Sequence, residues 1–271
     1  MSEILKAVLF GIVEGITEWL PISSTGHMIL LDEFVKLNMS ESFVNMFLVV
    51  IQLGAILAVV VLYYNKFWPF GAGFKLQADK VSLWGKIMVA CLPAAVIGLL
   101  FDDLIDQYFY NPWTVAIMLI VFGIGFIWIE NYNKTHQPTT TTLESISYKN
   151  AFYIGMFQLV AAVFPGTSRS GSTILGGIAL GLSREVAAEF TFFLAIPVMF
   201  GASLLKVAKH GFSFTAHEVS VLAVGMVVSF IVSILAIKFL MAYIKKHDFK
   251  AFGWYRIVLG ILVILYFTIN P

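Results

Sequence analysis

The sequence predicts an all-α integral membrane protein with six transmembrane helices and two re-entrant helix hairpins, arranged as an inverted-topology repeat. Three observations lead to this prediction: the composition, the lengths of the apolar runs, and two apolar stretches that are each interrupted by a polar loop. Of the 271 residues, 59% are hydrophobic and 12% are charged. Charged residues make up about a quarter of a typical soluble domain, so the composition excludes a soluble globular protein.

The charge and cysteine content exclude further classes. The formal net charge is +1, and no basic stripe typical of nucleic-acid binding is present. We therefore expect a lipid bilayer and no nucleic acid among the partners. The single cysteine, Cys91, cannot form an internal disulfide, and we expect it to fill space in the core. The first twenty residues carry Glu3, Glu14 and Glu18 without a basic n-region, so no cleaved signal peptide is expected.

Six apolar runs are long enough to cross a bilayer, which takes about 20 mostly apolar residues. They cover residues 43–64, 85–101, 113–130, 186–208, 218–240 and 252–270. Two further apolar stretches, at about 3–37 and 148–182, are each split by a proline and a polar loop. We interpret both as re-entrant hairpins, because non-helical backbone at membrane depth is tolerated only where protein or a water-filled cavity satisfies it. Two kinked spanning helices are the alternative.

Each half of the chain then contains one hairpin followed by three spans. Repeat one covers about 1–130, a hydrophilic linker covers about 131–147, and repeat two covers about 148–271, all in a single membrane domain. A repeat with an odd number of spans inserts its second copy upside down. The two hairpins would therefore enter from opposite faces, with tips that meet near the midplane.

The basic residues are distributed unevenly over the two ends of these spans. One end carries Lys66, Lys75, Lys80, Lys86, Lys134, Lys149, Arg184, Lys238, Lys245, Lys246, Lys250 and Arg256, and the other carries Lys6, Lys36, Lys206 and Lys209. An excess of Lys and Arg marks the cytoplasmic side. We therefore expect both termini, the entry of the first hairpin and an acidic loop at 102–106 (Asp102, Asp103, Asp106) to lie outside.

The first hairpin contains two carboxylates. Glu14 and Glu18 are four residues apart, so on a helix they share one face and repel each other. An ionisable residue inside a membrane costs at least about 2.5 kcal/mol, which makes such a pair a functional hypothesis. A divalent cation, a partner arginine or a protonated carboxyl would each offset the repulsion. The alternative is that both glutamates only face a hydrated outer vestibule.

The polar loop of this hairpin follows directly. Pro21 is expected to end the first helix, and Ser23, Ser24, Thr25 and Gly26 are typical of the start of the next one. A helix N-terminus binds anions through its free N–H groups and its dipole. One turn further on, His27 is placed to reach back to a hydroxyl as its base. A histidine that only hydrogen-bonds a neighbouring helix is the alternative.

The second hairpin repeats this arrangement with a permanent charge. Overlaying Pro21 on Pro165 sets Glu14 against Gln158 and Ser24 against Ser168. The residues expected to bind an anion here are Gln158, Gly166, Thr167, Ser168, Arg169 and Ser170. Arg169 is predicted to be the only basic residue at membrane depth. Its guanidinium would bind phosphate oxygens in a fork, or pair with Glu14 or Glu18 in the empty site; a permanent ion pair that locks the repeats together is the alternative.

Both loops resemble the signature motifs of one known family. Glu-Gly-Ile-Thr-Glu-Trp-Leu-Pro-Ile-Ser-Ser-Thr-Gly-His at 14–27 and Pro-Gly-Thr-Ser-Arg-Ser-Gly at 165–171 are similar to the two motifs of the undecaprenyl-diphosphate phosphatase family (UppP, also called BacA). The resemblance runs the length of the chain and includes the Gln-Leu-Gly-Ala run at 52–55. It implies removal of the terminal phosphate from undecaprenyl diphosphate in the bacterial plasma membrane, which recycles the lipid carrier for peptidoglycan and other envelope polymers. It also implies a link to bacitracin resistance.

The resemblance implies a divalent cation, Mg²⁺ or Ca²⁺, and carries the important positions onto Glu14, Glu18, Ser24, His27 and Arg169. The residue types fit these positions. We expect Ser24 to be a nucleophile activated by His27, Arg169 to hold the diphosphate, and the two glutamates to bind metal or move protons. A histidine nucleophile with Ser24 as a phosphate ligand is the alternative. Ser23, Thr25 and Gly26 complete the expected substrate contacts, the active site would open to the outer face, and a homodimer stays open.

Two other classes of protein share some of these features. A lipid or anion transporter, or a flippase, can be built on the same inverted repeat, but it has no need for a serine and histidine beside an arginine. A membrane phosphatase of the acid-phosphatase type needs a second histidine shortly after its Ser-Arg pair. After Arg169 no histidine follows until His210, so this second class is disfavoured.

Overall fold

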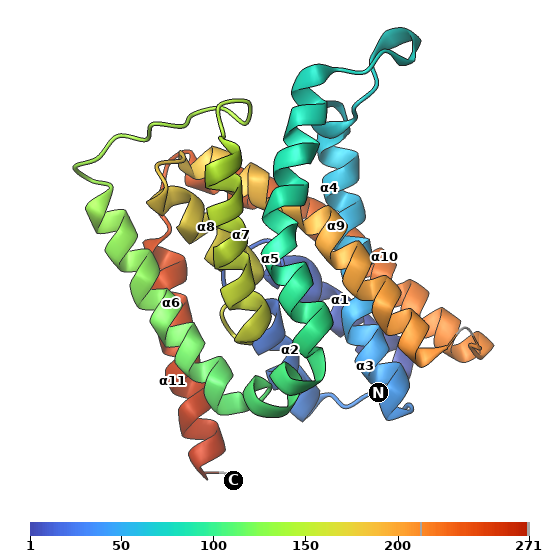
Figure 1. Cartoon of the computed structure of the whole chain (residues 1–271). Coiled ribbons are helices and arrows are strands. Elements are labelled where there is room, and N and C mark those ends of the chain that lie inside the picture. Colours follow the sequence, from blue (N-terminus) through green and yellow to red (C-terminus); the bar gives the residue numbers. More distant parts are fainter. Residues whose placement is uncertain (212, 270–271) are drawn as a thin grey trace.

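The computed structural model describes residues 1–211 and 213–269, without the side chains of Ala72, Asp102, Asp103 and Asp106. Its regular structure in this part of the chain is helical, apart from two isolated bridges. The elements in order are α1 (Glu3–Thr17), α2 (Ser24–Phe34), α3 (Glu41–Val50), α4 (Gln52–Phe67), η1 (Ala72–Phe74), α5 (Ala78–Phe109), α6 (Pro112–Tyr132), α7 (Tyr148–Val163), α8 (Arg169–Ala179), α9 (Arg184–His210), α10 (Ala216–Ile244) and α11 (Lys250–Ile269). Figure 1 shows the long helices surrounding the short α1, α2, α7 and α8.

Six helical stretches among the described residues are long and apolar enough to cross a membrane, and they match the six predicted runs. They are Glu41–Phe67 (α3 with α4), Ala78–Phe101 within α5, Pro112–Tyr132, Arg184–His210, Ala216–Ile244 and Lys250–Ile269. Large apolar side chains on their outer faces, such as Leu99, Ile117, Leu235 and Leu265, are exposed. A continuous apolar exterior of this kind is unfavourable in water and suits lipid, so the chain is a multi-pass membrane protein.

The two split stretches form helix pairs joined by tight loops. The pairs are α1 with α2 and α7 with α8, and each loop contains the predicted proline. The first helix of each pair ends before that proline, so the prediction that Pro21 itself ends the helix is displaced by a few residues: α1 stops at Thr17. A proline ring clashes with the carbonyl four residues earlier and disfavours helix at the residue before it, which explains the early end.

Close backbone contacts hold these short helices against the long ones. A Cβ added at Gly15 of α1 would lie 2.8 Å from the Ser229 carbonyl oxygen of α10, and one at Gly155 of α7 would lie 2.4 Å from the Ala90 carbonyl oxygen of α5. Such distances are shorter than real Cβ contacts allow. Small residues let membrane helices approach each other closely, which maximises van der Waals contact where lipid gives no hydrophobic driving force between helices.

The approach of α4 to α10 gives a stability prediction. A Cβ at Gly54 would lie 2.1 Å from the Met226 carbonyl oxygen, so we expect Gly54→Ala to push the two helices apart and to cost roughly 1–3 kcal/mol. Gly98 lies within α5, and a Cβ there meets nothing within 4 Å. Gly98→Ala is therefore the matched control and should be neutral or slightly stabilising. The midpoints of thermal unfolding of the two variants, monitored in detergent by gel filtration, provide the comparison. Equal unfolding midpoints would contradict this packing.

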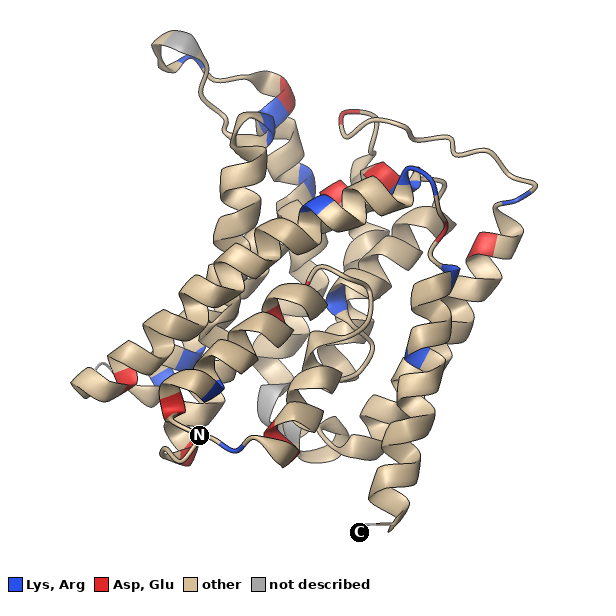
Figure 2. Cartoon of the chain, turned by 180° about the vertical axis from the view of Figure 1, so that it is seen from behind, with Lys and Arg blue, Asp and Glu red and all other residues tan. Residues whose placement is uncertain are grey.

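Charged residues gather at the two ends of the molecule, and only a few lie between them (Figure 2). Both termini lie at one end, whereas the α4–α5 connection, the 133–147 linker and the α10–α11 connection lie at the other (Figure 1). This agrees with the predicted division of basic residues except at Arg256, which is fully buried in the interior. The prediction of a loop at 102–106 is wrong, because α5 continues to Phe109 and no proline or glycine follows Gly98 to stop it. The side chains of the three aspartates lie outside the described residues.

Candidate active site at the junction of the two loops

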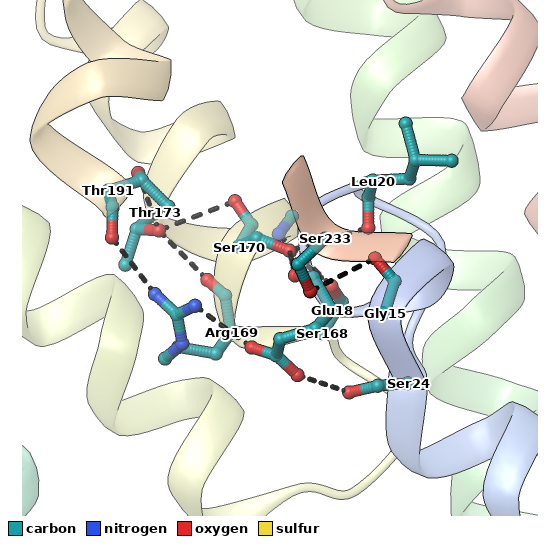
Figure 3. A network of polar contacts seen from close by, with 11 residues as sticks. Gly15, Glu18, Leu20, Ser24, Ser168, Arg169, Ser170, Thr173, Thr191 and Ser233 are labelled. Carbon is teal, nitrogen blue, oxygen red and sulfur yellow. Dashed lines mark hydrogen bonds and ion pairs between the residues drawn. The ribbon is translucent and has the colours of Figure 1, made fainter. Parts of the chain in front are cut away.

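The two loops meet inside the molecule, as the repeat predicted. The hydroxyl of Ser170, at the start of α8, donates to the Glu18 carbonyl oxygen at 2.9 Å. The Arg169 guanidinium lies beside the Glu18 carboxylate, with Nη2 and Oε1 2.9 Å apart. Figure 3 shows the side chains of both loops turned toward one another. A segment near residue 18 and one near residue 170 therefore form one polar centre.

Both loops start their second helix in the same unusual way. Ser23 and Ser168 have positive φ angles of 75° and 69°, and each side chain accepts a hydrogen bond from the backbone N–H three residues later. These two serines are the N-caps of α2 and α8. The structural overlay therefore pairs Ser23 with Ser168, and the sequence overlay that paired Ser24 with Ser168 is wrong by one residue. The reason is that one residue separates Pro21 from the cap of α2, whereas two residues separate Pro165 from the cap of α8.

The corrected register places Ser24 and Arg169 at equivalent positions, and both contact one carboxylate. Ser24 Oγ donates to Glu18 Oε2 at 2.6 Å, and Arg169 Nη2 donates to Glu18 Oε1 at 2.9 Å. Glu18 is only 4% exposed. Charge-assisted hydrogen bonds of this kind are the strong ones in a buried site. The predicted pairing of Arg169 with one of the two glutamates is thus present, and it is Glu18 that takes part.

His27 does not contact the Ser24 hydroxyl. Its Nδ1 lies 2.7 Å from the Ser23 carbonyl oxygen, and its Nε2 lies 2.7 Å from the Tyr255 hydroxyl. Both ring nitrogens are therefore occupied by groups other than Ser24, whose hydrogen bond goes to Glu18. The expected Ser24–His27 pair is not formed in this structure, because the first turn of α2 directs the two side chains to different partners.

Glu14 has no hydrogen-bond partner although its side chain is fully buried. Both of its carboxylate oxygens lack a donor, while Glu18 repels it and Arg169 attracts it. Hard divalent cations bind carboxylate oxygens, and Mg²⁺ is often held by one or two carboxylates together with substrate phosphates. No group of three His, Cys, Asp or Glu suited to a metal occurs among the described residues. Glu14 and Glu18 therefore fit a cation whose other ligands come from a phosphate or water.

Two donors beside this centre also lack partners. Arg169 Nε and Thr167 Oγ1 are buried without an acceptor. Unsatisfied buried donors are costly, and an anion bound at the starts of α2 and α8 would satisfy them. The loops thus combine orphaned donors for an anion with an orphaned carboxylate for a cation.

The other predicted substrate-binding residues have varied surroundings. Gly166 has a φ of +89° and lies against the backbone of Val115. A Cβ added at Gly166 would be 2.4 Å from the Val115 carbonyl oxygen. The Gly26 N–H donates to the Ser23 cap. Gln158 is buried in α7, and both polar atoms of its amide lack a partner. Thr25 is half-buried in the first turn of α2.

Arg256 is a residue that sequence reasoning misplaced. It is fully buried, so the prediction that Arg169 is the only basic residue at this depth is wrong. Its guanidinium donates to the carbonyl oxygens of Pro21 at 3.2 Å, Gly166 at 2.9 Å and Thr167 at 2.8 Å. One side chain from α11 therefore ties both loops together. The sequence feature that could have indicated its burial is its position as the seventh residue of an apolar helix that begins at Lys250.

Fold and centre together define a class: a multi-pass helical membrane protein in which two broken helix pairs enclose a buried cluster of carboxylate, hydroxyl and guanidinium groups. The model of the bacitracin resistance protein BacA family matches residues 7–262. The chain belongs to this family.

Individual relatives agree over nearly the whole chain. An undecaprenyl-diphosphatase of Desulfitobacterium hafniense is 66% identical over 270 residues, covering 99% of this chain and 97% of that protein. Undecaprenyl-diphosphatase 1 of Clostridium acetobutylicum is 64% identical over 98% of each chain. An undecaprenyl-diphosphatase of Enterococcus faecalis is 61% identical, covering 97% of this chain and 96% of that protein.

Proposed function

We propose that the protein is an undecaprenyl-diphosphate phosphatase, which hydrolyses the lipid diphosphate to undecaprenyl phosphate and inorganic phosphate and thereby contributes to bacitracin resistance. The observation that carries the proposal is the Glu18 carboxylate, which contacts a hydroxyl of one loop and a guanidinium of the other. Relatives that share 56–66% of their residues over nearly their full length bear the same enzyme name.

The chemistry starts at Ser24. Its hydroxyl already donates to Glu18, so the carboxylate can take the proton as the Ser24 oxygen attacks the terminal phosphorus. The bond between that phosphorus and the bridging oxygen breaks, the Glu18 carboxyl gives its proton to that oxygen, and the lipid monophosphate leaves. The regenerated carboxylate then takes a proton from water as the water oxygen attacks the phosphoserine, and it returns that proton to the Ser24 oxygen as phosphate is released. This assigns to Glu18 the base role that the sequence alone gave to His27; a His27 nucleophile is the alternative.

Arg169 holds the phosphate oxygens in this proposal. It exchanges its contact with Glu18 for the incoming diphosphate and offers Nε as a further donor, since that atom has no partner within the protein. The free N–H groups at the start of α2 and α8 would add to the stabilisation of the negative charge that builds up in the transition state. Thr167 adds its free hydroxyl.

A divalent cation, Mg²⁺ or Ca²⁺, would be held by Glu14 and Glu18 together with the diphosphate. When bound, it would offset charge on the phosphate oxygens. We expect Glu14→Gln to raise the Mg²⁺ concentration needed for half-maximal activity and to lower activity at saturating Mg²⁺ by roughly 10–100-fold. Glu189→Gln, which breaks an ion pair with Lys66 at 2.7 Å outside the two loops, is the control. An unchanged Mg²⁺ requirement in Glu14→Gln would mean that Glu14 does not bind the cation and has a role in proton transfer only.

The arrangement in the membrane follows from the division of charge. The α1–α2 and α7–α8 pairs are taken as re-entrant hairpins of an inverted repeat, with the basic end of the molecule cytoplasmic. Both termini then lie outside, the site opens to the outer face, and the isoprenoid tail lies against the apolar exterior of the spans. A homodimer is compatible with this arrangement.

Phosphate release tests the function directly. Purified protein in detergent, given undecaprenyl diphosphate and Mg²⁺, should release one phosphate per lipid and leave the monophosphate. A transporter or flippase built on the same repeat would move lipid between leaflets of a vesicle without releasing phosphate. Absence of phosphate release with any isoprenyl diphosphate and either cation would refute the enzyme.

A further inference from the structure

The partners of His27 determine which of its nitrogens carries a proton. Nδ1 lies 2.7 Å from the Ser23 carbonyl oxygen, and a carbonyl oxygen can only accept a hydrogen bond. Nδ1 must therefore be the donor. In a neutral imidazole the other nitrogen then has a free lone pair, so Nε2 is the basic atom of His27.

The Tyr255 hydroxyl occupies this basic atom. It lies 2.7 Å from Nε2, and the two rings are nearly parallel, with centroids 5.7 Å apart and planes inclined by 4°. A hydroxyl can donate to a neutral Nε2 and accept from a protonated one. Tyr255 therefore suits both protonation states, and its hydrogen bond, together with that of the Ser23 carbonyl, orients the imidazole.

Among the described residues, Tyr255 is the titratable group that contacts Nε2 of His27. The titratable or charged groups that act on His27 are Tyr255 and Arg256, both on α11, and the Arg256 guanidinium disfavours a second positive charge on the ring. Helix α6, which also packs against α2, presents Val115 and Leu119 near Gly26. Tyr255 itself is 45% exposed.

We propose that Tyr255 is a positioning residue, which together with the Ser23 carbonyl holds His27 as the Nδ1–H tautomer with Nε2 directed outward from the first turn of α2. One consequence concerns the resting site, where Nε2 is covered. Of the two ring nitrogens only Nε2 can gain a proton, and it keeps the Tyr255 hydroxyl as its hydrogen-bond partner when it does so. The tautomer assignment is independent of the proposed phosphatase activity, and only its kinetic effect rests on that activity.

Nitrogen NMR of the unmodified protein provides the first test. Protein labelled with ¹⁵N-histidine, in detergent, gives five pairs of ring signals, and His27→Gln identifies the pair of His27. We expect Nδ1 to be protonated and Nε2 to be the unprotonated nitrogen in the neutral ring. A neutral His27 with its proton on Nε2 would overturn the proposal without any variant at Tyr255.

The variant Tyr255→Phe provides the second test, because it removes the hydroxyl and keeps the aromatic ring. We expect the tautomer to stay and the Nε2 signal to move downfield, since an unprotonated nitrogen loses its hydrogen-bond donor. We expect kcat to fall about five- to tenfold, the effect of one hydrogen bond, with KM within about twofold. A Tyr255→Phe protein with an unmoved Nε2 signal would show that the hydroxyl does not bind His27.

Tyr132→Phe is the matched control. Tyr132 likewise lies against a histidine ring: its centroid is 3.9 Å from that of His136, and the two planes are inclined by 10°. This pair lies at the C-terminal end of α6, outside the two loops. Its variant should leave both kcat and the His27 signals unchanged. An equal loss of kcat in both variants would indicate a general effect of removing a tyrosine hydroxyl and would also overturn the proposal.

Discussion

The variant Ser24→Ala is expected to lose at least about a thousandfold in kcat for phosphate release, because removal of a nucleophile leaves only binding and charge stabilisation. The hydroxyl that disappears is the one that donates to Glu18 Oε2 at 2.6 Å. The fold should survive, since Ser23 and not Ser24 caps α2. Thermal unfolding of the variant should therefore stay close to that of the wild type.

Ser203→Ala is the control for Ser24→Ala. Ser203 is also buried, and it donates to the Val49 carbonyl oxygen in contact between α9 and α3. Its variant should retain nearly full activity. Substantial activity in Ser24→Ala would exclude the serine nucleophile and favour His27, and trapping with ³²P-labelled substrate would then place the label on a histidine.

Comparison of Glu18→Gln with His27→Gln separates the two candidate bases. Glu18 contacts the Ser24 hydroxyl and His27 does not. General-base catalysis contributes about 10²–10⁴-fold, so the larger loss should appear in Glu18→Gln. The opposite order would mean that the first turn of α2 rearranges when substrate binds.

The second large effect is expected for Arg256→Met, which should both destabilise the protein and abolish most activity. Methionine keeps the apolar length of the side chain but leaves the carbonyl oxygens of Pro21, Gly166 and Thr167 without their donor. An unsatisfied buried acceptor costs about 1–3 kcal/mol, and near the lower end of that range the three carbonyl oxygens together reduce the free energy of unfolding by roughly 3–5 kcal/mol. The loops would also separate, which disrupts the contact between Glu18 and Arg169.

Thermal unfolding and phosphate release at a temperature well below the transition measure these two effects. Arg256→Lys should recover part of the stability, since an ammonium group donates to fewer carbonyls in a less fixed geometry. Lys246→Met removes an exposed cation at the end of α10 and should change neither quantity. Wild-type stability in Arg256→Met would mean that the two loops are held by other contacts.

The interaction of Arg256 with carbonyls alone has an electrostatic consequence. Its hydrogen-bond acceptors are the backbone oxygens of the two loops and of Met118 and Leu119 on α6, with no carboxylate among them. Arg169, in contrast, is paired with Glu18. Arg256 therefore has no carboxylate among its hydrogen-bond acceptors, and at the junction as a whole the two arginines are offset by the carboxylates of Glu14 and Glu18.

Local sequence determined the helices and the two breaks. Hydropathy over about 20 residues identifies a span because each residue contributes its own transfer energy, and all six predicted runs are helices in the structure. The breaks were predictable for an equally local reason, because proline and capping serines act within one turn. The same local signals indicated Glu14, Glu18, Ser24 and Arg169.

Tertiary structure decided which of these groups touch. Whether Ser24 meets Glu18 or His27 depends on the positive φ of Ser23, a backbone state that a serine adopts only when its surroundings require it. The partner of His27 comes from α11, 228 residues away in sequence.

The burial of Arg256 shows the limit of sequence reasoning most clearly. Hydropathy assigns an arginine near the end of an apolar run to the membrane surface, because an isolated charge is costly in lipid. The cost disappears only when the carbonyls of two distant loops and of α6 surround the guanidinium. The sequence by itself therefore determined that this is a helical membrane protein with two polar loops, and only the packing of α11 against α6 decided that one arginine joins those loops into a single site.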